Sequence, residues 1–200
     1  IEATGREISS WSDVFDPTFV GLVTFLDEAR ASLGAILLHL GYSPNTTNQI
    51  EINEAAEFLK SNASQIAVYA PDTGQDLLAA GEVDIAMEWN GDIFYIIPDN
   101  PDVRYMIPED GAIIWADNLC LVANAPNKEN AELFMNYILE PEVGAALSNY
   151  IKYASPNQAA LPFIDEEDLN NPGMYPPEEV RAKLFFLSDV GEATQLYDDA

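Results

Sequence analysis

Short apolar runs alternate with helical patterns along this chain, and this alternation predicts an α/β fold in which mostly parallel strands are covered by helices. Residues 22–26 form an apolar run typical of a buried strand, and residues 29–40 follow with helical spacing. A second helix is expected over residues 52–60, with Asn53 as its candidate N-cap, and a short strand over residues 66–69. In open sheets of this kind, ligands bind at the carboxyl ends of the strands.

The later part of the chain continues this pattern. A strand at residues 83–87 runs into Trp89-Asn90-Gly91-Asp92, where another helix is expected to begin. Further strands are expected at residues 103–107, 112–115 and 119–123, helices at residues 130–139 and from Pro141, and a last pair of helices from near Glu178 and Glu192. Residues 161–177 combine several prolines with an acidic run, which indicates a surface connector. Cys120 lies in an apolar run and is expected to be buried.

Tryptophan and aspartate occur close together twice, at Trp89 and Asp92 and again at Trp115 and Asp117, and Tyr153 follows further along. A protonated amine taken out of water needs a carboxylate partner, and both its ammonium group and its aliphatic stem gain from aromatic faces. The repeated pairing therefore predicts a site for a cationic, methylene-rich ligand. The alternative is that the tryptophans are core residues at strand ends and the aspartates are turn or capping residues.

The charge balance argues against nucleic acid as a partner. The sequence has 34 Asp and Glu residues against 8 Lys and Arg residues, which gives a formal net charge of -26. Such a field repels phosphate and anionic lipid headgroups and steers cations towards the surface. An acidic surface also serves solubility or a salty habitat, so the charge by itself does not identify a ligand.

The sequence lacks the motifs typical of enzymes. His39 is the single histidine and is expected to be an ordinary helix residue, and there is no Cys/His ligand spacing, phosphate-binding loop or nucleophile elbow. We therefore expect a binding protein without catalytic residues, metal ligands or cofactors. A hydrolase that uses paired acids such as Asp27 and Glu28 is the alternative from another class, and a fragment without activity of its own is a further one.

Several stretches, in a shared order and spacing, carry a resemblance to a known family. They are Glu88-Trp89-Asn90-Gly91-Asp92, Pro108-Glu109-Asp110-Gly111, Trp115-Ala116-Asp117, and residues 11–17, 26–30, 40–43, 127–129, 153–157 and 175–191. Over nearly its whole length the chain resembles the C-terminal part of the spermidine/putrescine-binding proteins of bacterial ABC importers. Each stretch is a weak signal alone, and it is the set that makes the resemblance specific.

The resemblance implies a clamshell of the type II periplasmic-binding-protein kind, with mostly one lobe and part of the other in this chain. Residues 1–115 and 162–200 would form the C-terminal lobe, and residues 116–161 would belong to the N-terminal lobe. The implied function is capture of putrescine or spermidine and delivery to the membrane permease of an ABC importer, without chemistry. The implied location is the periplasm, or a lipid-anchored extracytoplasmic position where the source lacks an outer membrane. A monomer is expected, with association of copies through the incomplete lobe as the alternative.

Residue roles follow from the same resemblance. Trp89 and Trp115 would be aromatic walls along the methylene stem of the ligand. Asp117 would bind one amine, and Tyr153 would add an aromatic face or a hydroxyl. Asp92 matches a position that is acidic in putrescine-preferring relatives, so it would grip a second amine.

Two positions depart from the family pattern. The family's acid one turn into the first helix falls at Ala31, and its late polar contact falls at Leu187. Glu28, three residues before Ala31 on the same helical face, is the candidate replacement, although a glutamate there is also typical of a helix N-terminus. Loss of one carboxylate while Asp92 is retained favours a diamine over a triamine. The alternative keeps the fold and binds another cationic or small organic solute.

Overall fold

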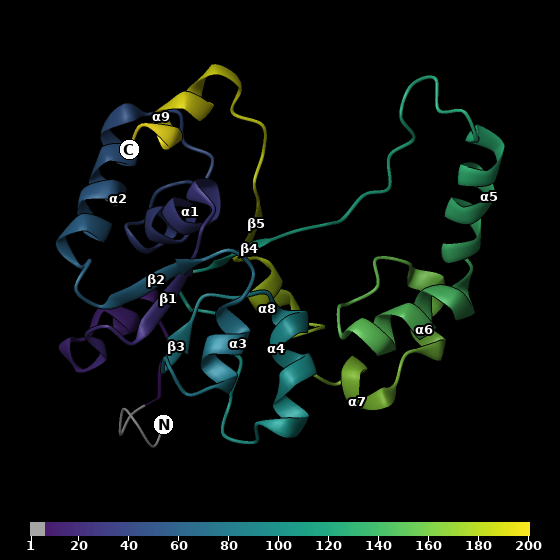
Figure 1. The fold of residues 1–200 in the computed structure, drawn as a ribbon, viewed down its shortest axis with the longest axis horizontal. Helices are drawn as coiled ribbons and strands as arrows, with labels where there is room; N and C mark the ends of the chain where they lie inside the picture. Colours follow the sequence, from purple (N-terminus) through teal and green to yellow (C-terminus); the bar gives the residue numbers. More distant parts are fainter. Residues whose placement is uncertain (1–6) are drawn as a thin grey trace.

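The computed structural model describes residues 7–200, so residues 1–6 of the predicted C-terminal lobe lie outside the described part of the chain. Figure 1 shows an α/β body on one side and a set of helices that extends away from it on the other. We call this extension, residues 116–169, the helical arm, and the rest of the described chain, residues 7–115 and 170–200, the body. Within residues 7–200, no helix has both the length and the apolar character needed to cross a bilayer.

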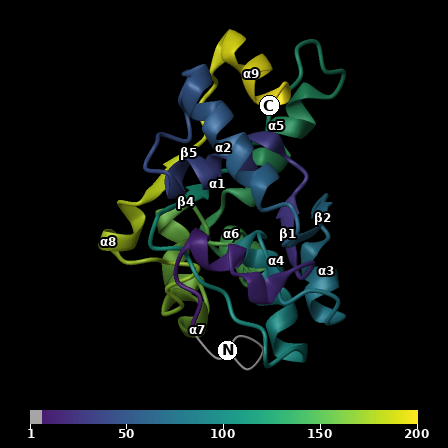
Figure 2. The same ribbon diagram turned by 90° about the vertical axis from the view of Figure 1, so that its left-hand side faces the viewer.

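Three parallel strands form the main sheet, in the order β2-β1-β3. The strands are β1 (Val23–Leu26), β2 (Ile66–Ala70) and β3 (Ile85–Ala86), and the helices around them are α1 (Ala29–His39), α2 (Gln49–Ser61), α3 (Gly74–Ala79) and α4 (Asn90–Ile96). In Figures 1 and 2, α1 and α2 lie on one side of the sheet, and α3 and α4 lie on the other. The predicted α/β layering is thus present in this body.

The core of the body forms between the sheet and the helices α1 and α2. All four residues of β1 are buried, as the continuous apolar run predicted for a central strand. Phe25 of β1 stacks on Phe15, which ends the short 3-10 helix Trp11–Phe15. The two ring centroids are 5.7 Å apart. Near the chain's end, α9 (Thr194–Asp198) adds Tyr197, which is 1% exposed and donates a hydrogen bond to the Thr46 carbonyl at 2.7 Å.

Helix ends follow local capping chemistry. Gly41 adopts a φ of +80° just after α1, a conformation that glycine tolerates best, and its N–H donates to the Leu38 carbonyl at 3.0 Å. At the start of α2, the side-chain oxygen of Asn48 accepts the Ile50 N–H at 3.0 Å. Asn53 therefore lies inside α2, and its predicted role as the N-cap is wrong.

A second, two-stranded parallel sheet stands where the chain leaves the body and where it returns. It pairs β4 (Ala112–Ile114) with β5 (Leu184–Phe186). Between them lie α5 (Lys128–Ile138), α6 (Pro141–Ile151), the 3-10 helix Gln158–Phe163, α7 (Glu166–Leu169) and α8 (Glu178–Arg181). The remaining 3-10 helices are Pro17–Phe19, Ile97–Asp99 and Gly191–Ala193.

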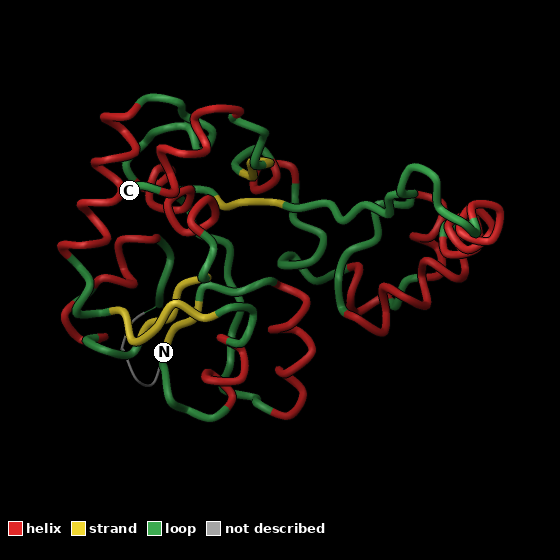
Figure 3. The backbone as a smooth tube through the Cα atoms, turned by 45° about the horizontal axis from the view of Figure 1, so that its top comes forward, coloured by secondary structure: helices red, strands yellow, loops and turns green. Residues whose placement is uncertain are grey.

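Several predicted elements differ from the structure in this second half. Residues 103–107 and 119–123 form no strand, and the predicted connector at residues 161–177 contains α7 and the end of a 3-10 helix. Figure 3 shows the residues beyond β4 as an extended loop that leads to the helices of the arm. Cys120 lies in this loop and is exposed, so its predicted burial is wrong. The apolar run there has no neighbouring layer to bury it.

The arm exposes much of its apolar surface. No residue of α5 is buried, and its Leu133, Phe134 and Tyr137 are all more than half exposed. A small buried cluster around Ala145 and Ile164 is the arm's own core. The arm is therefore much less completely packed than the body.

Candidate functional site

Acidic residues gather at the carboxyl edge of the main sheet. Asp72 follows β2, Glu88 follows β3, and Asp92 lies in the first turn of α4. One carboxylate oxygen from each of these three residues lies within 4.8 Å of the other two. We call them the acid cluster. Their position is the one at which open α/β sheets bind ligands.

Repulsion within the acid cluster favours the binding of a positive charge. Two unit charges about 4.8 Å apart repel by about 1 kcal/mol in water and by about 3–4 kcal/mol at an effective dielectric constant of about 20. Glu88 is held in place because it accepts the Gly74 N–H at 2.7 Å and the Trp89 N–H at 3.2 Å. Burial, together with the charges of Asp72 and Asp92, raises the pKa of Glu88, although the two backbone N–H groups act in the opposite direction.

Tyr153 connects the arm to this cluster. It follows α6, and its hydroxyl donates to Asp92 Oδ2 at 2.6 Å. Its ring lies against Gly91 in α4, where a side chain would leave no room for it. Burial and the hydrogen bond to Asp92 raise the pKa of Tyr153, so the phenol remains protonated and keeps donating at neutral pH.

Trp89 and Trp115 form an aromatic pair. Their ring centroids lie 5.8 Å apart at an interplanar angle of 78°, an edge-to-face arrangement. Trp89 immediately precedes α4 and Trp115 immediately follows β4, so residues that are distant in sequence meet here. Trp115 remains 49% exposed, which leaves part of its face open to a ligand.

The structure thus brings four of the six predicted site residues into two pairs, Trp89 with Trp115 and Asp92 with Tyr153. Asp117 lies two residues beyond Trp115 and is exposed. Glu28 is the N-cap of α1, and its carboxylate accepts the N–H groups of Arg30 at 3.1 Å and Ala31 at 2.6 Å. The helix-terminal role that the sequence also allowed for Glu28 is therefore present.

Sequence reasoning did not place Asp72 or Glu88 in the binding site. Glu88 stands beside Trp89 in the motif that carried the family resemblance, and its position after a predicted strand was the available signal. Asp72 has a φ of +53°, in the left-handed region that aspartate tolerates better than most residues. Its place after β2 was a second, weaker signal.

The chemistry of this arrangement is that of cation binding. Carboxylates supply charge-assisted hydrogen bonds, and the tryptophan faces attract ammonium groups and cover methylene groups. A histidine base and a cysteine nucleophile are both absent from these groups, because His39 ends α1 with its ring 5.3 Å from Phe58 and Cys120 lies in the exposed loop. As predicted, His39 is an ordinary helix residue.

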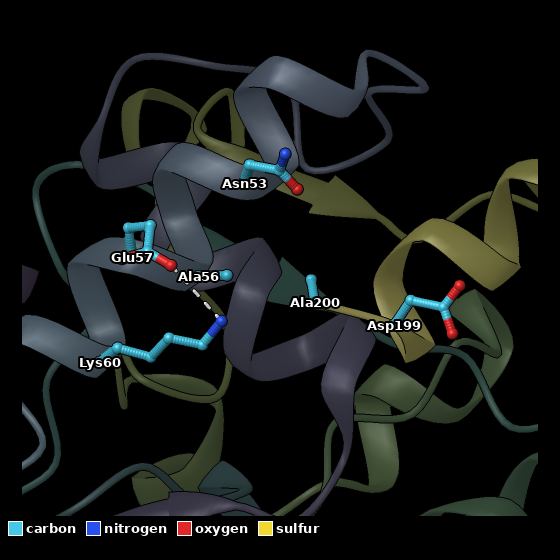
Figure 4. A pocket seen from close by; sticks show the side chains of 6 residues that line it. All are labelled: Asn53, Ala56, Glu57, Lys60, Asp199 and Ala200. Atoms are coloured by element: carbon cyan, nitrogen blue, oxygen red, sulfur yellow. Dashed lines mark hydrogen bonds and ion pairs between the residues drawn. The ribbon is translucent and has the colours of Figure 1, made fainter.

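A shallow pocket elsewhere on the body is unrelated to this site. Asn53, Ala56, Glu57 and Lys60 of α2 line it together with the last two residues of the chain, as Figure 4 shows. Within it, Lys60 pairs with Glu57 at 3.5 Å, one turn away on the same helix. A mostly solvated pair of this kind contributes little to stability or binding.

Comparison with known proteins gives a consistent result. Residues 2–174 match the family model described as bacterial extracellular solute-binding protein. The chain is 34% identical over 194 residues to the spermidine/putrescine-binding periplasmic protein of Salmonella typhimurium, covering 97% of this chain and 56% of that relative. It is also 34% identical to the putrescine-binding periplasmic protein of Escherichia coli, covering 82% of this chain and 46% of the relative. The chain thus spans about half the length of the curated relatives it matches.

Solved structures show the same fold. A putative spermidine/putrescine ABC transporter from Listeria monocytogenes superposes with a TM-score of 0.88 at 27% identity, covering 97% of this chain and 62% of that one. A lipoprotein of Treponema pallidum gives a TM-score of 0.85 at 22% identity, with 99% and 62% covered. These likenesses confirm the predicted fold class, and the chain corresponds to about three fifths of the solved chains.

Proposed function

Because the chain belongs to the family of bacterial extracellular solute-binding proteins, we propose that it is the polyamine-binding part of an importer's receptor, which captures putrescine or spermidine outside the cytoplasm. The two curated relatives above are named as periplasmic binding proteins, one for spermidine and putrescine and the other for putrescine. The function is thus capture without chemistry. Its partners are a cationic polyamine and the membrane permease of an ABC importer.

The observation that carries this proposal is the meeting of an aromatic pair with carboxylates at one edge of the sheet. Trp89 links the two groups, since its ring centroid lies 5.8 Å from that of Trp115 and its backbone N–H donates to the Glu88 carboxylate in the acid cluster. A polyamine needs aromatic walls for its methylene stem and an acid for each ammonium group. Asp92, oriented by Tyr153, supplies one such acid, and Asp117 is the acid proposed for another amine.

The proposed division into lobes follows from the path of the chain. Residues 1–115 and 162–200 would be one lobe, and residues 116–161 the part of the other lobe that this chain supplies. The β4-β5 pair lies where the chain passes from one to the other, and the bond between Tyr153 and Asp92 joins them. The ligand would favour a closed arrangement of these two parts, which the permease then recognises.

The two departures from the family pattern support a diamine in preference to a triamine. Ala31 is fully buried in α1 and supplies no charge, and the Glu28 carboxylate is already engaged in capping that helix. Leu187 offers only an apolar side chain. With fewer acids available for a third amine, putrescine should bind more tightly than spermidine.

Calorimetric titration with putrescine and with spermidine tests this proposal, at low and at physiological ionic strength, with Asp117→Ala as the variant. Long-range attraction by the net charge is screened by salt, whereas a shaped site retains its ligand. Saturable one-to-one binding that persists in salt and is lost in the variant is the expected result. Binding that disappears in salt, or that the variant retains in full, would contradict it.

A further inference from the structure

We propose that Asp72, Glu88 and Asp92 form a binding site for a divalent metal cation of the calcium type, with the buried hydroxyl of Thr24 beneath it. The three carboxylate oxygens that face one another come from the ends of two different strands and from α4. This site is distinct from the aromatic pair. Its existence does not depend on the nature of the organic ligand.

The geometry of the acid cluster suits a hard cation. Calcium binds six to eight oxygen ligands at about 2.3–2.6 Å, so oxygens on opposite sides of the ion stand about 5 Å apart. The three carboxylate oxygens, all within 4.8 Å of one another, fall inside that limit without movement of the backbone. Carboxylate ligands without sulfur or imidazole favour calcium or magnesium over softer metals. Magnesium demands a near-ideal octahedral arrangement at about 2.0–2.1 Å, whereas calcium accepts flexible geometry, so the cluster suits calcium better.

Thr24 is an independent observation that points to the same site. The residue is completely buried, and its Oγ1 has no hydrogen-bond partner among residues 7–200. Its Cα is paired with that of Ala86, the last residue of β3, and Glu88 follows two residues further along. A buried hydroxyl without a partner is unusual in a folded protein and often marks a bound water or ion.

Gly74 leaves open the space between the hydroxyl and the cluster. A Cβ built on it would stand 2.9 Å from Thr24 Oγ1 and 2.5 Å from Glu88 Oε1. Both oxygens therefore border the same small volume, which any larger residue at position 74 would fill. A metal held by the acid cluster would carry water in its open positions, and one such water would give Thr24 its missing partner.

The cation site and the proposed amine site share Asp92. A metal ion on Asp92 removes the negative charge that an ammonium group needs, so the two ligands should exclude each other at that carboxylate. Only this consequence rests on the proposed function. The metal site itself can be tested without any polyamine.

The experiment is a calcium titration of the protein at physiological ionic strength, by calorimetry and by terbium luminescence excited through the nearby Trp89. Asp72→Asn and Glu88→Gln remove one charge each, and asparagine retains the left-handed backbone that residue 72 requires. Asp84→Asn is the matched control, since Asp84 is exposed and precedes the opposite end of β3. One site per chain is expected, weakened about 10-fold or more by the first two variants and unchanged in the control.

The many exposed acids will also bind calcium weakly, so the outcome depends on the variants. If the control weakens terbium binding as much as Asp72→Asn and Glu88→Gln do, or if no saturable site exists, the metal site is refuted. Thr24→Val adds a readout that does not depend on charge. It should raise the melting temperature of the metal-free protein and reduce the further rise produced by calcium. A calcium-induced rise equal to that of the wild-type chain would contradict the placement of Thr24.

Discussion

Replacing Gly91 with alanine tests the packing that joins the arm to the body. A Cβ at residue 91 would stand 2.6 Å from Cγ of Tyr153 and closer still to Cδ2 and Cε2, whereas ordinary contacts begin at 3.4 Å. The ring must therefore move by roughly 1 Å, because a packed core accommodates an added methyl group only through such shifts. This movement breaks the 2.6 Å hydrogen bond to Asp92.

The sign of the change in stability distinguishes loss of the Tyr153 contact from a change in helix propensity alone. Gly91 is a helical residue whose φ is not positive, so alanine meets no backbone strain there, and helix propensity alone would stabilise the variant by about 0.8–1 kcal/mol. Loss of a hydrogen bond to a charged acceptor costs about 1.5–3 kcal/mol. The expected net result is a decrease of about 0.5–2 kcal/mol in the free energy of unfolding.

Urea unfolding followed by tryptophan fluorescence and circular dichroism measures this change, and Tyr153→Ala provides the control background. Without the Tyr153 ring, Gly91→Ala should be neutral or stabilising, so the two positions should show a coupling energy of about 1–3 kcal/mol in a double-mutant cycle. The reasoning is refuted if Gly91→Ala stabilises the wild-type chain. It is equally refuted if the loss is the same in both backgrounds.

Three further predictions concern single side chains. Tyr153→Phe removes the donor that orients Asp92 and should weaken putrescine binding about 10-fold by calorimetry, and unchanged affinity would separate Tyr153 from the ligand. Burial raises the pKa of Tyr105 to about 12 in the folded protein, against about 10 in the unfolded chain. The neutral phenol therefore contributes about 2–3 kcal/mol to the free energy of unfolding at pH values below about 10. This contribution is lost as the pH rises through about 12. Alkaline unfolding of Tyr105→Phe should lack that loss, and identical pH profiles would contradict it. Cys120 is exposed and should react with a thiol reagent as fast in the native as in the urea-unfolded protein, and protection in the native state would contradict its exposure.

Local pattern was sufficient to predict the first strand and helix of the body and the junction before α4. The run at residues 22–26 became β1 because a central strand is buried on both faces and needs no alternation. The helix predicted after it, at residues 29–40, was confirmed as α1 because its apolar residues recur at helical spacing. Trp89 and Asp92 were placed correctly at a strand-to-helix junction because the carboxyl ends of parallel strands meet at one edge.

Long-range contacts explain most of what the sequence did not reveal. The strand β5 has three residues within the apolar run at residues 184–187, a run too short to distinguish a strand from part of a helix, and it pairs with β4 about 70 residues earlier. The apolar runs at residues 103–107 and 119–123 have strand composition but find no partner strand. Asn48 and Asn53 are equivalent as capping residues by type, and the choice between them depends on where the helix backbone begins.

The acid cluster shows why a binding site can be anticipated from a sequence without being fully specified by it. A chain with 34 acids offers many adjacent carboxylates, and adjacency in sequence did not distinguish Asp72 and Glu88 from the others. What distinguishes them is that β2 and β3, on either side of β1, end at the same edge of the sheet, and that Asp92 lies in the first turn of α4 close to both. Tyr153, delivered from the arm, then holds Asp92 by one oxygen and leaves the carboxylate able to accept from a second partner. The same contact thus positions an acid for a cation and connects the two parts of the chain, so a cation bound at Asp92 would affect how firmly the arm is held against the body.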